Sequence, residues 1–260
     1  MTSVNSGHVD YAHFVWNTML TSSVHDIIIA SLSRHGVLDI DDQNAIRTLT
    51  LTQRQIEPSA YLVREGEKPI RCSFVLAGFT YCQRLTSTGA RQIVSLQIPG
   101  DFVDLQNPWF DESDHNVQAL TRAQIVDIDV SALRGLVAER SAIAAALWRM
   151  ALIDSSILRE WIVNIGRRDA HTRVGHLLCE FSLRREVAGI ASARADHLPM
   201  TQEQLGDTVG LTPVHVNRVL KALAHRGLIE RDRRQIRIVD WAGLRDASDF
   251  NPRYLHLAPR

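Results

Sequence analysis

The sequence predicts an α+β protein with an N-terminal antiparallel β-roll of the jelly-roll type, a long helix and a C-terminal winged helix-turn-helix. Three patterns support this fold class. Residues 51–129 hold short apolar runs separated by glycines, which is typical of short antiparallel strands. Residues 131–166 carry apolar side chains at helical spacing. Residues 200–239 hold two short helix patterns around a glycine, followed by a charged hairpin.

The composition is that of a globular protein, because 45% of the 260 residues are hydrophobic and 22% are charged. Lys and Arg number 29, and so do Asp and Glu. This balance argues against a protein that coats nucleic acid but allows a local basic face. The three cysteines show no disulfide or CxxC spacing, which predicts a reducing, cytoplasmic compartment. No secretory signal and no apolar run of ~18–20 residues is evident, so we expect no membrane association.

Helical spacing begins between Tyr11 and Leu38, where we expect one or two helices. A further short helix is expected from Asp39 to Leu49, with Asp41 or Asp42 near its start. The β-roll strands are then expected at the apolar runs Tyr61–Val63, Phe74–Leu76, Phe79–Cys82, Ile93–Ile98 and Ile125–Ile128. The turns between them are expected at Gly66, Gly78, Gly89 and Gly100.

The long helix carries a heptad-like seam that can pair with a copy of itself. The seam consists of Leu147, Ala151, Asp154, Leu158, Trp161 and Ile165. A polar member such as Asp154 can fix the register of such a pair at a cost in stability. The alternative is that the seam packs against the chain's own β-roll. We expect a homodimer, because a helix-turn-helix usually binds two half-sites with two-fold symmetry.

The C-terminal helices have recognisable caps. Thr201 should cap a first helix, with Gln204 closing a capping box, and Gly210 should end it. Thr212 should cap a second helix that has Pro213 in its first turn. The inward face of the second helix is expected to be Val216, Val219, Leu220 and Leu223.

A second helix held in this way presents its polar N-terminal residues to the major groove of DNA. Arg218 can bond guanine in a bidentate manner, Asn217 can pair with adenine, and Val214 can touch a thymine methyl. The other candidate DNA-binding residues, mainly for phosphate, are Thr201, Gln202, Thr212, Pro213, His215, Lys221, Arg226, Arg233 and Arg234. The alternative is a helical hairpin in a core with solvated charges. The caps, the turn and the basic wing together favour DNA binding.

The order of parts resembles the Crp/Fnr family of bacterial transcription regulators. The segment Leu96–Val103, LQIPGDFV, resembles that family's PGDF-type segment, and Thr201–Leu223 resembles its helix-turn-helix. The resemblance implies a dimer that senses a signal in the β-roll, binds near-palindromic promoters and contacts RNA polymerase. It also implies the following organisation: an N-terminal extension (1–24), a cyclic-nucleotide-binding-like sensor domain (25–135), a dimerisation helix (136–166), a DNA-binding domain (167–245) and a C-terminal tail (246–260).

The effector cassette departs from the family's cyclic-AMP pattern. A Gly-Glu pair and a later Arg-Ser pair hold the ribose and the cyclic phosphate in that branch, whereas this chain has Asp104-Leu105 and His115-Asn116. Leu105 cannot accept a hydrogen bond from ribose, and a neutral His115 gives phosphate far less charge than arginine. Losing the bidentate arginine removes about 1.5–3 kcal/mol. We therefore expect a pocket at Val103, Asp104, Leu105, His115 and Asn116 without tight cyclic AMP binding.

Other effectors of the family also find little support in the sequence. The iron–sulfur branch uses N-terminal cysteines, and this chain has none before Cys72. A haem would need a histidine such as His115, His171 or His176, but single histidines on mixed faces are more often surface or capping residues. Cys72 and Cys82 offer a thiol switch across neighbouring strands, with small core residues as the alternative. The cofactor therefore stays unknown.

The DNA target should differ from that of the cyclic-AMP branch. That branch has Arg and Glu where this chain has Pro213 and Val214, and only Arg218 matches its later arginine. An enzyme is disfavoured, because the acidic β-roll residues Asp101 to His115 come without any nucleophile-elbow, HExxH, P-loop or Rossmann pattern. The other alternative is a β-roll that binds a small molecule or a protein, with no DNA-dependent role.

Overall fold

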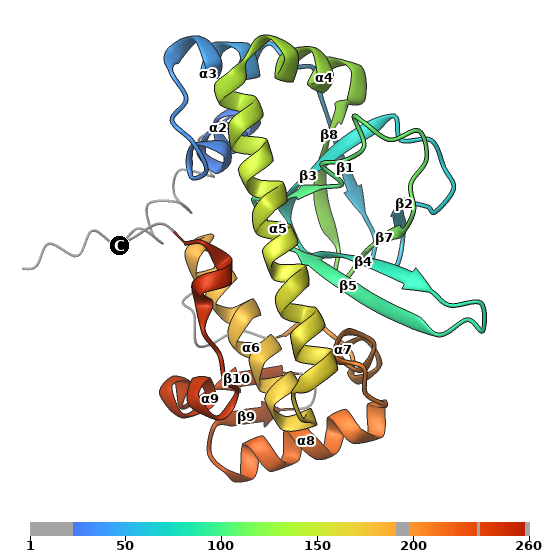
Figure 1. The fold of residues 1–260 in the computed structure, drawn as a ribbon, viewed down its shortest axis with the longest axis vertical. Coiled ribbons are helices and arrows are strands. Elements are labelled where there is room, and N and C mark those ends of the chain that lie inside the picture. The colour runs from blue at the N-terminus through green and yellow to red at the C-terminus, as the bar shows by residue number, and fades with distance from the viewer. Residues whose placement is uncertain (1–22, 191–197, 233–234, 258–260) are drawn as a thin grey trace, which may run out of the picture.

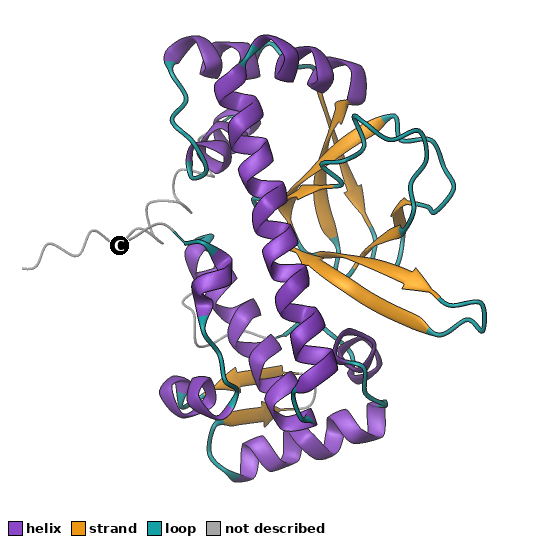
Figure 2. Cartoon of the chain, in the orientation of Figure 1, coloured by secondary structure: helices purple, strands orange, loops and turns teal. Residues whose placement is uncertain are grey.

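In the computed structural model, the described part of the chain comprises residues 23–190, 198–232 and 235–257, without the side chains of residues 232 and 235. A long helix, α5 (Ser141–Arg167), forms the axis of the molecule. The β-roll lies beside its N-terminal half and the helix-turn-helix beside its C-terminal end (Figure 1). Figure 2 shows the strands gathered on one side of α5, apart from the short two-stranded wing. The predicted α+β architecture is confirmed.

The β-roll consists of two four-stranded antiparallel sheets, as the alternating apolar runs predicted. Their strand orders are β1-β8-β3-β6 and β2-β7-β4-β5. The strands are β1 (Leu51–Ile56), β2 (Tyr61–Val63), β3 (Arg71–Ala77), β4 (Thr80–Leu85), β5 (Arg91–Gln97), β6 (Phe102–Val103), β7 (Asn116–Ala119) and β8 (Ala123–Asp129). Gly66, Gly78, Gly89 and Gly100 all have positive φ angles and make turns between strands.

Two short helices precede the β-roll. In α2 (Val24–Ser33) the Ser23 side chain caps the first turn, and in α3 (Ile40–Arg47) Asp39 and Asp42 form a reciprocal capping box. The helix expected from Asp39 to Leu49 is therefore confirmed. Of the earlier helical prediction, only the part from residue 23 onward lies inside the described residues.

The helical region after the β-roll is interrupted, which corrects the prediction of continuous helix from Ser131 to Gly166. Helix α4 (Val130–Glu139) ends at Arg140, whose extended backbone (φ −123°, ψ 92°) turns the chain before α5 starts at Ser141. The expected start of the long helix at residue 136 thus falls inside α4. Apolar spacing continues across Arg140, so the sequence pattern does not reveal the corner.

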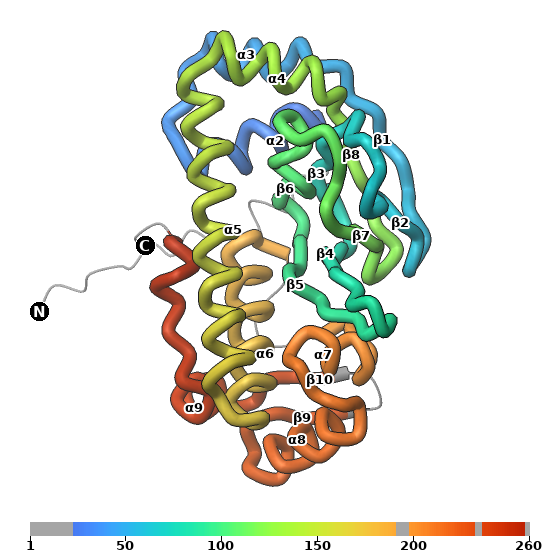
Figure 3. The backbone as a smooth tube through the Cα atoms, turned by 45° about the vertical axis from the view of Figure 1, so that its right-hand side comes forward, coloured from blue at the N-terminus to red at the C-terminus, as the bar shows by residue number. Residues whose placement is uncertain are grey.

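The C-terminal part packs around α6 (Ala170–Val187), whose first turn is capped by Asp169. It contains α7 (Gln202–Val209), α8 (Pro213–His225), β9 (Ile229–Asp232), β10 (Gln235–Ile238), α9 (Trp241–Ala247) and the 3-10 helix η1 (Pro252–Leu255). The two strands pair as an antiparallel wing. Figure 3 shows α7 below the β4–β5 hairpin and α8 at the lower end of the molecule.

One core cluster joins the β-roll to this C-terminal part. Ile93 and Leu96 of β5 are buried in the same cluster as Leu205 of α7 and Val219 of α8. A second cluster lies between the β1-β8-β3-β6 sheet, α2, α3 and the upper part of α5. Because apolar burial is the main favourable term in folding, the shared cluster makes the sensor and helix-turn-helix parts cooperate in stability.

The helix-turn-helix turn is tight. Thr201 and Gln204 form the predicted capping box, and Gly210 ends α7 in the left-handed conformation at φ 67°. A Cβ placed on Gly206 would lie 2.4 Å from the carbonyl oxygen of Leu211. Neither helix can therefore move closer, and a side chain at residue 206 would force them apart.

We predict that Gly206→Ala lowers the free energy of unfolding by about 1–3 kcal/mol through this clash. Gly135→Ala in α4 is the matched control, because a Cβ there meets nothing within 4 Å. The control should stabilise the protein by about 0.5–1 kcal/mol, since alanine restricts the unfolded chain more than glycine does. Urea unfolding of both variants measures the difference. Equal effects of the two substitutions would contradict the packing argument.

Candidate nucleic-acid interface and sensor pocket

Helix α8 has one buried and one open face. Val216, Val219, Leu220 and Leu223 are all buried, as predicted. Pro213, Val214, Arg218 and Lys221 are exposed, with Val214 72% exposed. Thr212 caps the helix by accepting a hydrogen bond from the amide of His215. The N-terminal part of α8 therefore projects from the molecule with a mixed apolar and basic surface (Figure 1).

Asn217 makes a contact that the sequence did not predict. Its Oδ1 accepts a hydrogen bond from Arg231 of β9 at 2.9 Å, so the amide is tied to the wing. Bidentate pairing with adenine needs both the oxygen and the nitrogen of the amide. The contact leaves the second lone pair of Oδ1 and the amide nitrogen for a base, so pairing with adenine stays a prediction, and Asn217 in addition positions Arg231. Sequence spacing could not show this contact, because Asn217 and Arg231 lie on different elements.

The other candidate DNA-binding residues surround α8. Thr201 is exposed at the N-terminus of α7, with Gln202 partly buried beside it. Arg226 is exposed just after the last turn of α8. Arg233 and Arg234, predicted as basic wing residues, lie outside the described residues. The described members of the set thus gather around one helix and its two neighbours.

Helix α7 is held against the β4–β5 hairpin by polar contacts. Arg91 Nε donates to Asp207 Oδ2 at 2.6 Å, and Gln92 Nε2 donates to the carbonyl oxygen of Thr208 at 3.2 Å. Arg184 of α6 adds a second bridge, since it donates to Asp101 at 2.8 Å and to the Leu96 carbonyl oxygen at 3.0 Å. The helix-turn-helix therefore docks on its own sensor domain.

The exposed apolar stripe of α5 lies one residue away from the predicted seam. Leu147 and Trp161 are each only 5% exposed because they pack against their own chain, so these two residues cannot face a partner helix. Ala151, Asp154 and Leu158 border a pocket that Trp148 and Ser155 also line, and Asp154 and Leu158 are exposed. The exposed apolar residues Trp148, Leu152 and Ile162 each lie one position after a predicted seam residue, in a row that Ser155, Arg159 and Gly166 continue. Heptad spacing fits both rows of residues, so the sequence does not choose between them.

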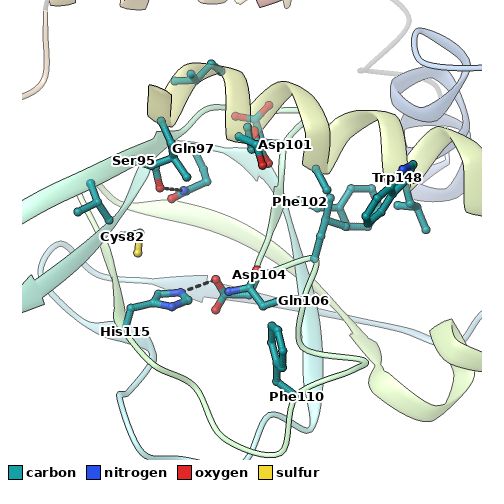
Figure 4. Close-up of a pocket in the computed structure, with 18 of the residues that line it drawn as sticks. Cys82, Ser95, Gln97, Asp101, Phe102, Asp104, Gln106, Phe110, His115 and Trp148 are labelled. Carbon is teal, nitrogen blue, oxygen red and sulfur yellow. Dashed lines mark hydrogen bonds and ion pairs between the residues drawn. The ribbon is translucent and has the colours of Figure 1, made fainter. Parts of the chain in front are cut away.

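A pocket of about 740 Å³ opens between the β-roll and α5. Figure 4 shows Asp104 facing His115 on the β-roll side, while Trp148 projects from α5. Asp104, Leu105 and His115 line the pocket as predicted. Val103 is instead buried inside the β-roll, and Asn116 is buried with its Oδ1 accepting from the amide of Glu65. These two residues are therefore removed from the predicted pocket set.

His115 is held between two carboxylates. Its Nε2 donates to Asp104 Oδ1 at 2.6 Å and its Nδ1 donates to Asp114 Oδ1 at 2.7 Å. Burial opposes the charge, but the hydrogen bond to Asp104 overcomes this and raises the pKa of His115 to about 11. The expectation of a mostly neutral His115 applied to an unperturbed imidazole, and this one is perturbed. The imidazolium is nevertheless fully engaged by protein carboxylates, so its charge is not available to a phosphate.

The cysteines are core residues. Cys72 lies on β3 and Cys82 on β4, and these strands belong to different sheets, so the two thiols do not meet across neighbouring strands as the switch hypothesis required. Both are buried, and burial raises the pKa of each thiol. Cys179 is likewise buried, in the C-terminal core. Protonated buried thiols behave as small apolar side chains.

Two known domain families match parts of this chain. Residues 172–247 match the Crp-like helix-turn-helix domain and residues 53–140 match the cyclic nucleotide-binding domain. The solved structure of FixK2 from Bradyrhizobium japonicum is 25% identical, covers 76% of this chain and 98% of that chain, and superposes with a TM-score of 0.71. The chain belongs to the Crp/Fnr family of transcription regulators.

Curated relatives agree with this assignment to the Crp/Fnr family. A protein of Rhizobium leguminosarum bv. viciae with the name "Probable transcriptional activator" is 26% identical over 205 residues, or 79% of this chain and 81% of that protein. The transcriptional activator protein FnrA of Stutzerimonas stutzeri is 24% identical over 207 residues, or 80% of this chain and 84% of that protein. The family is one of transcription regulators and not of enzymes.

This Crp/Fnr chain differs from the cyclic-AMP branch at the pocket itself. Asp104 takes the glycine position of the Gly-Glu pair and has a left-handed backbone with φ 57°, which aspartate tolerates better than most residues. Leu105 takes the glutamate position and presents no acceptor for ribose. Sequence comparison found these two departures. It missed the aromatic side chains Trp109, Phe110 and Trp148, which also line the pocket. Trp109 and Phe110 lie on a loop, and Trp148 lies on a face of α5 for which the sequence predicted no site.

We predict that deprotonation of His115 makes the protein less stable as the pH rises above neutral. Its folded-state pKa is raised above the unfolded value near 6.5, so its contribution is present below that pH and is lost as pH rises toward 11. The slope cannot exceed about 1.4 kcal/mol per pH unit. His115→Gln should remove this loss between pH 7 and 9, as measured by urea unfolding. The exposed His171→Gln is the control and should leave the pH profile unchanged.

Proposed function

We propose that this Crp/Fnr regulator binds a near-palindromic promoter site in duplex DNA as a homodimer, and that a signal bound in its pocket sets its activity. The single observation that carries the proposal is the open N-terminal face of α8, with Arg218 and Lys221 exposed beside Val214. An α-helix fits the major groove, and these side chain types contact guanine, phosphate and the thymine methyl.

Kinship supports the finer parts of this proposal. Relatives such as FnrA are named transcriptional activators, which favours action at promoters through RNA polymerase. The same kinship favours a cytoplasmic location. In this proposal Arg218 contacts a base, while Thr201, Gln202, His215, Lys221 and Arg226 contact phosphates. Arg231, held by Asn217, joins the phosphate-contacting group because it lies next to α8.

The exposed stripe of α5 supports dimerisation. Leu152, Ile162 and Val163 are exposed apolar residues on this one helix, and such contiguous surfaces usually mark an interface. By length and composition alone, α5 is also apolar enough to cross a membrane. Its opposite face, with Ile143, Ala146 and Ile157, is packed against the rest of the chain. A two-fold pair of α5 helices would explain why both faces are apolar, because the chain itself covers one face and the partner would cover the other.

We predict that Arg218→Ala weakens binding to the preferred site by about 1–3 kcal/mol and relaxes the preference at one base position. The measurement is selection of bound sequences from a random DNA pool, followed by titration of the selected site. Arg122→Ala is the matched control, because it removes an exposed arginine from the β-roll far along the chain from α8. It should change neither affinity nor preference.

A uniform weakening across all sequences would move Arg218 to the phosphate-contacting group. The proposal of sequence-specific DNA binding is itself contradicted if the wild-type protein selects no sequence from the pool. Salt titration separates the alternatives further. A regulator should lose DNA affinity steeply as salt rises, whereas a β-roll that only binds a small molecule or protein should retain little DNA at any salt concentration.

We predict that Ile162→Glu disrupts the dimer. Ile162 is 70% exposed in the single chain, and two-fold symmetry would bury two new carboxylates at once. The dimer dissociation constant should rise about a hundredfold or more, equivalent to about 2.7 kcal/mol, and promoter binding should fall with it. Sedimentation equilibrium measures the change. Ile70→Glu is the control, since Ile70 is 62% exposed on the β-roll, and unchanged self-association in Ile162→Glu would refute the α5 interface.

A further inference from the structure

The charges in the wall of the pocket are unevenly satisfied. Among the described residues that line it, the cations are His115, Arg184 and Arg84, and each already has a carboxylate partner. His115 is paired with Asp104 and Asp114. Arg184 is paired with Asp101 at 2.8 Å, and Arg84 with a glutamate outside the pocket at 3.2 Å. An anionic ligand would therefore find no unpaired cation there.

The aspartates are in surplus. Asp101, Asp104, Asp114 and Asp154 line the pocket, against the three cations. The Asp104 side chain is only 6% exposed, and its Oδ2 atom is buried with no hydrogen-bond partner. Asp154 lies on α5 across from the β-roll and makes no hydrogen bond or ion pair within the described residues, but desolvation raises its pKa to about 7, so it carries only part of a charge at pH 7. A buried acceptor without a donor costs free energy until a ligand supplies one.

Aromatic side chains border the same space. Trp109, Phe110 and Trp148 are 56%, 60% and 67% exposed and all line the pocket. Figure 4 shows Phe110 beside Asp104 and Trp148 on α5. Aromatic faces attract cations and stack on flat apolar groups. The volume of about 740 Å³ is within the range of sites for small organic ligands.

We propose that this pocket binds an organic cation, namely a protonated amine carried on an aromatic body. The ammonium group donates to the unpaired Oδ2 atom of Asp104, and the surplus carboxylates supply its counter-charge. The aromatic body lies against Trp109, Phe110 and Trp148. This inference rests on the proposed sensory role of the pocket and specifies the class of signal. It also gives a second reason why a cyclic nucleotide is excluded, because its phosphate would face Asp104.

The experiment uses three probes that share an indole ring and differ in charge. Isothermal titration calorimetry of the full-length protein at pH 7 compares tryptamine, the neutral indole-3-ethanol and the anionic indole-3-acetate, with cyclic AMP as a fourth ligand. Tryptamine should bind at least about tenfold more tightly than indole-3-ethanol, a difference of about 1.4 kcal/mol. Indole-3-acetate and cyclic AMP should bind more weakly still. Tighter binding of either anion, or no heat from tryptamine up to millimolar concentration, would overturn the proposal.

Matched variants test the role of Asp104. Asp104→Asn keeps the shape and suits the left-handed backbone at φ 57°, since asparagine also tolerates that region. It should abolish the preference for tryptamine over indole-3-ethanol. Asp114→Asn removes the other partner of His115, an 86% exposed carboxylate, and should keep the preference. If both variants behave alike, the site is not centred on Asp104.

A failure of the ligand proposal can be distinguished from a failure of the proposed DNA-binding function. The random-pool selection is repeated with and without tryptamine. Sequence selection without tryptamine binding would leave the regulator proposal standing and overturn the ligand class. Tryptamine binding by a protein that selects no DNA sequence would support the pocket and contradict the regulator.

Discussion

The structure depends on the way α5 divides its surface between two neighbours. One face, with Ile143, Ala146 and Ile157, is buried against both the sensor part and the C-terminal part of the same chain. The opposite stripe stays exposed, although it carries the large apolar side chains Trp148, Leu152 and Ile162. Burial of apolar area is the largest favourable term in folding and association. The helix is thus stable within one chain but still presents a surface for a second copy.

The pocket illustrates how a family scaffold can keep its shape while its chemistry changes. The cassette lies in a β-roll, with Gly100 and Asp104 both in the left-handed region of φ. The charges in the pocket differ from the cyclic-AMP pattern, however, because the positive charge of His115 is balanced by the carboxylates of Asp104 and Asp114. A site in which every cation is paired cannot repeat the phosphate recognition of the cyclic-AMP branch. The side chains, and not the fold, therefore decide which ligand the pocket can accept.

Local patterns predicted much of the molecule. Caps at Thr201 and Thr212, the αL residue Gly210 and the inward valines and leucines of α8 depend on residues close in sequence, and all were predicted correctly. The β-roll was also predicted, because alternation and glycine turns are local signals.

The features that the sequence did not predict depend on contacts between segments that are far apart in the chain. Trp161 fits the heptad spacing, but it is buried in the C-terminal core, where its Nε1 donates to Glu180 on α6. The Asn217 oxygen accepts a hydrogen bond from Arg231, which lies on the wing and not on α8. The His115 pKa required knowledge of Asp104, which lies eleven positions earlier in the chain but across the pocket loop. No single-sequence periodicity carries such information.

The contact between Arg91 and Asp207 gives the β4–β5 hairpin mechanical leverage over the recognition helix. Helix α7 is clamped to the hairpin on one side and locked to α8 through the Gly206–Leu211 approach on the other. These contacts couple the orientation of the hairpin to that of α8. In the proposed two-fold dimer, a change in the hairpin's angle would therefore change the separation of the two α8 helices, and with it the half-site spacing that the dimer fits.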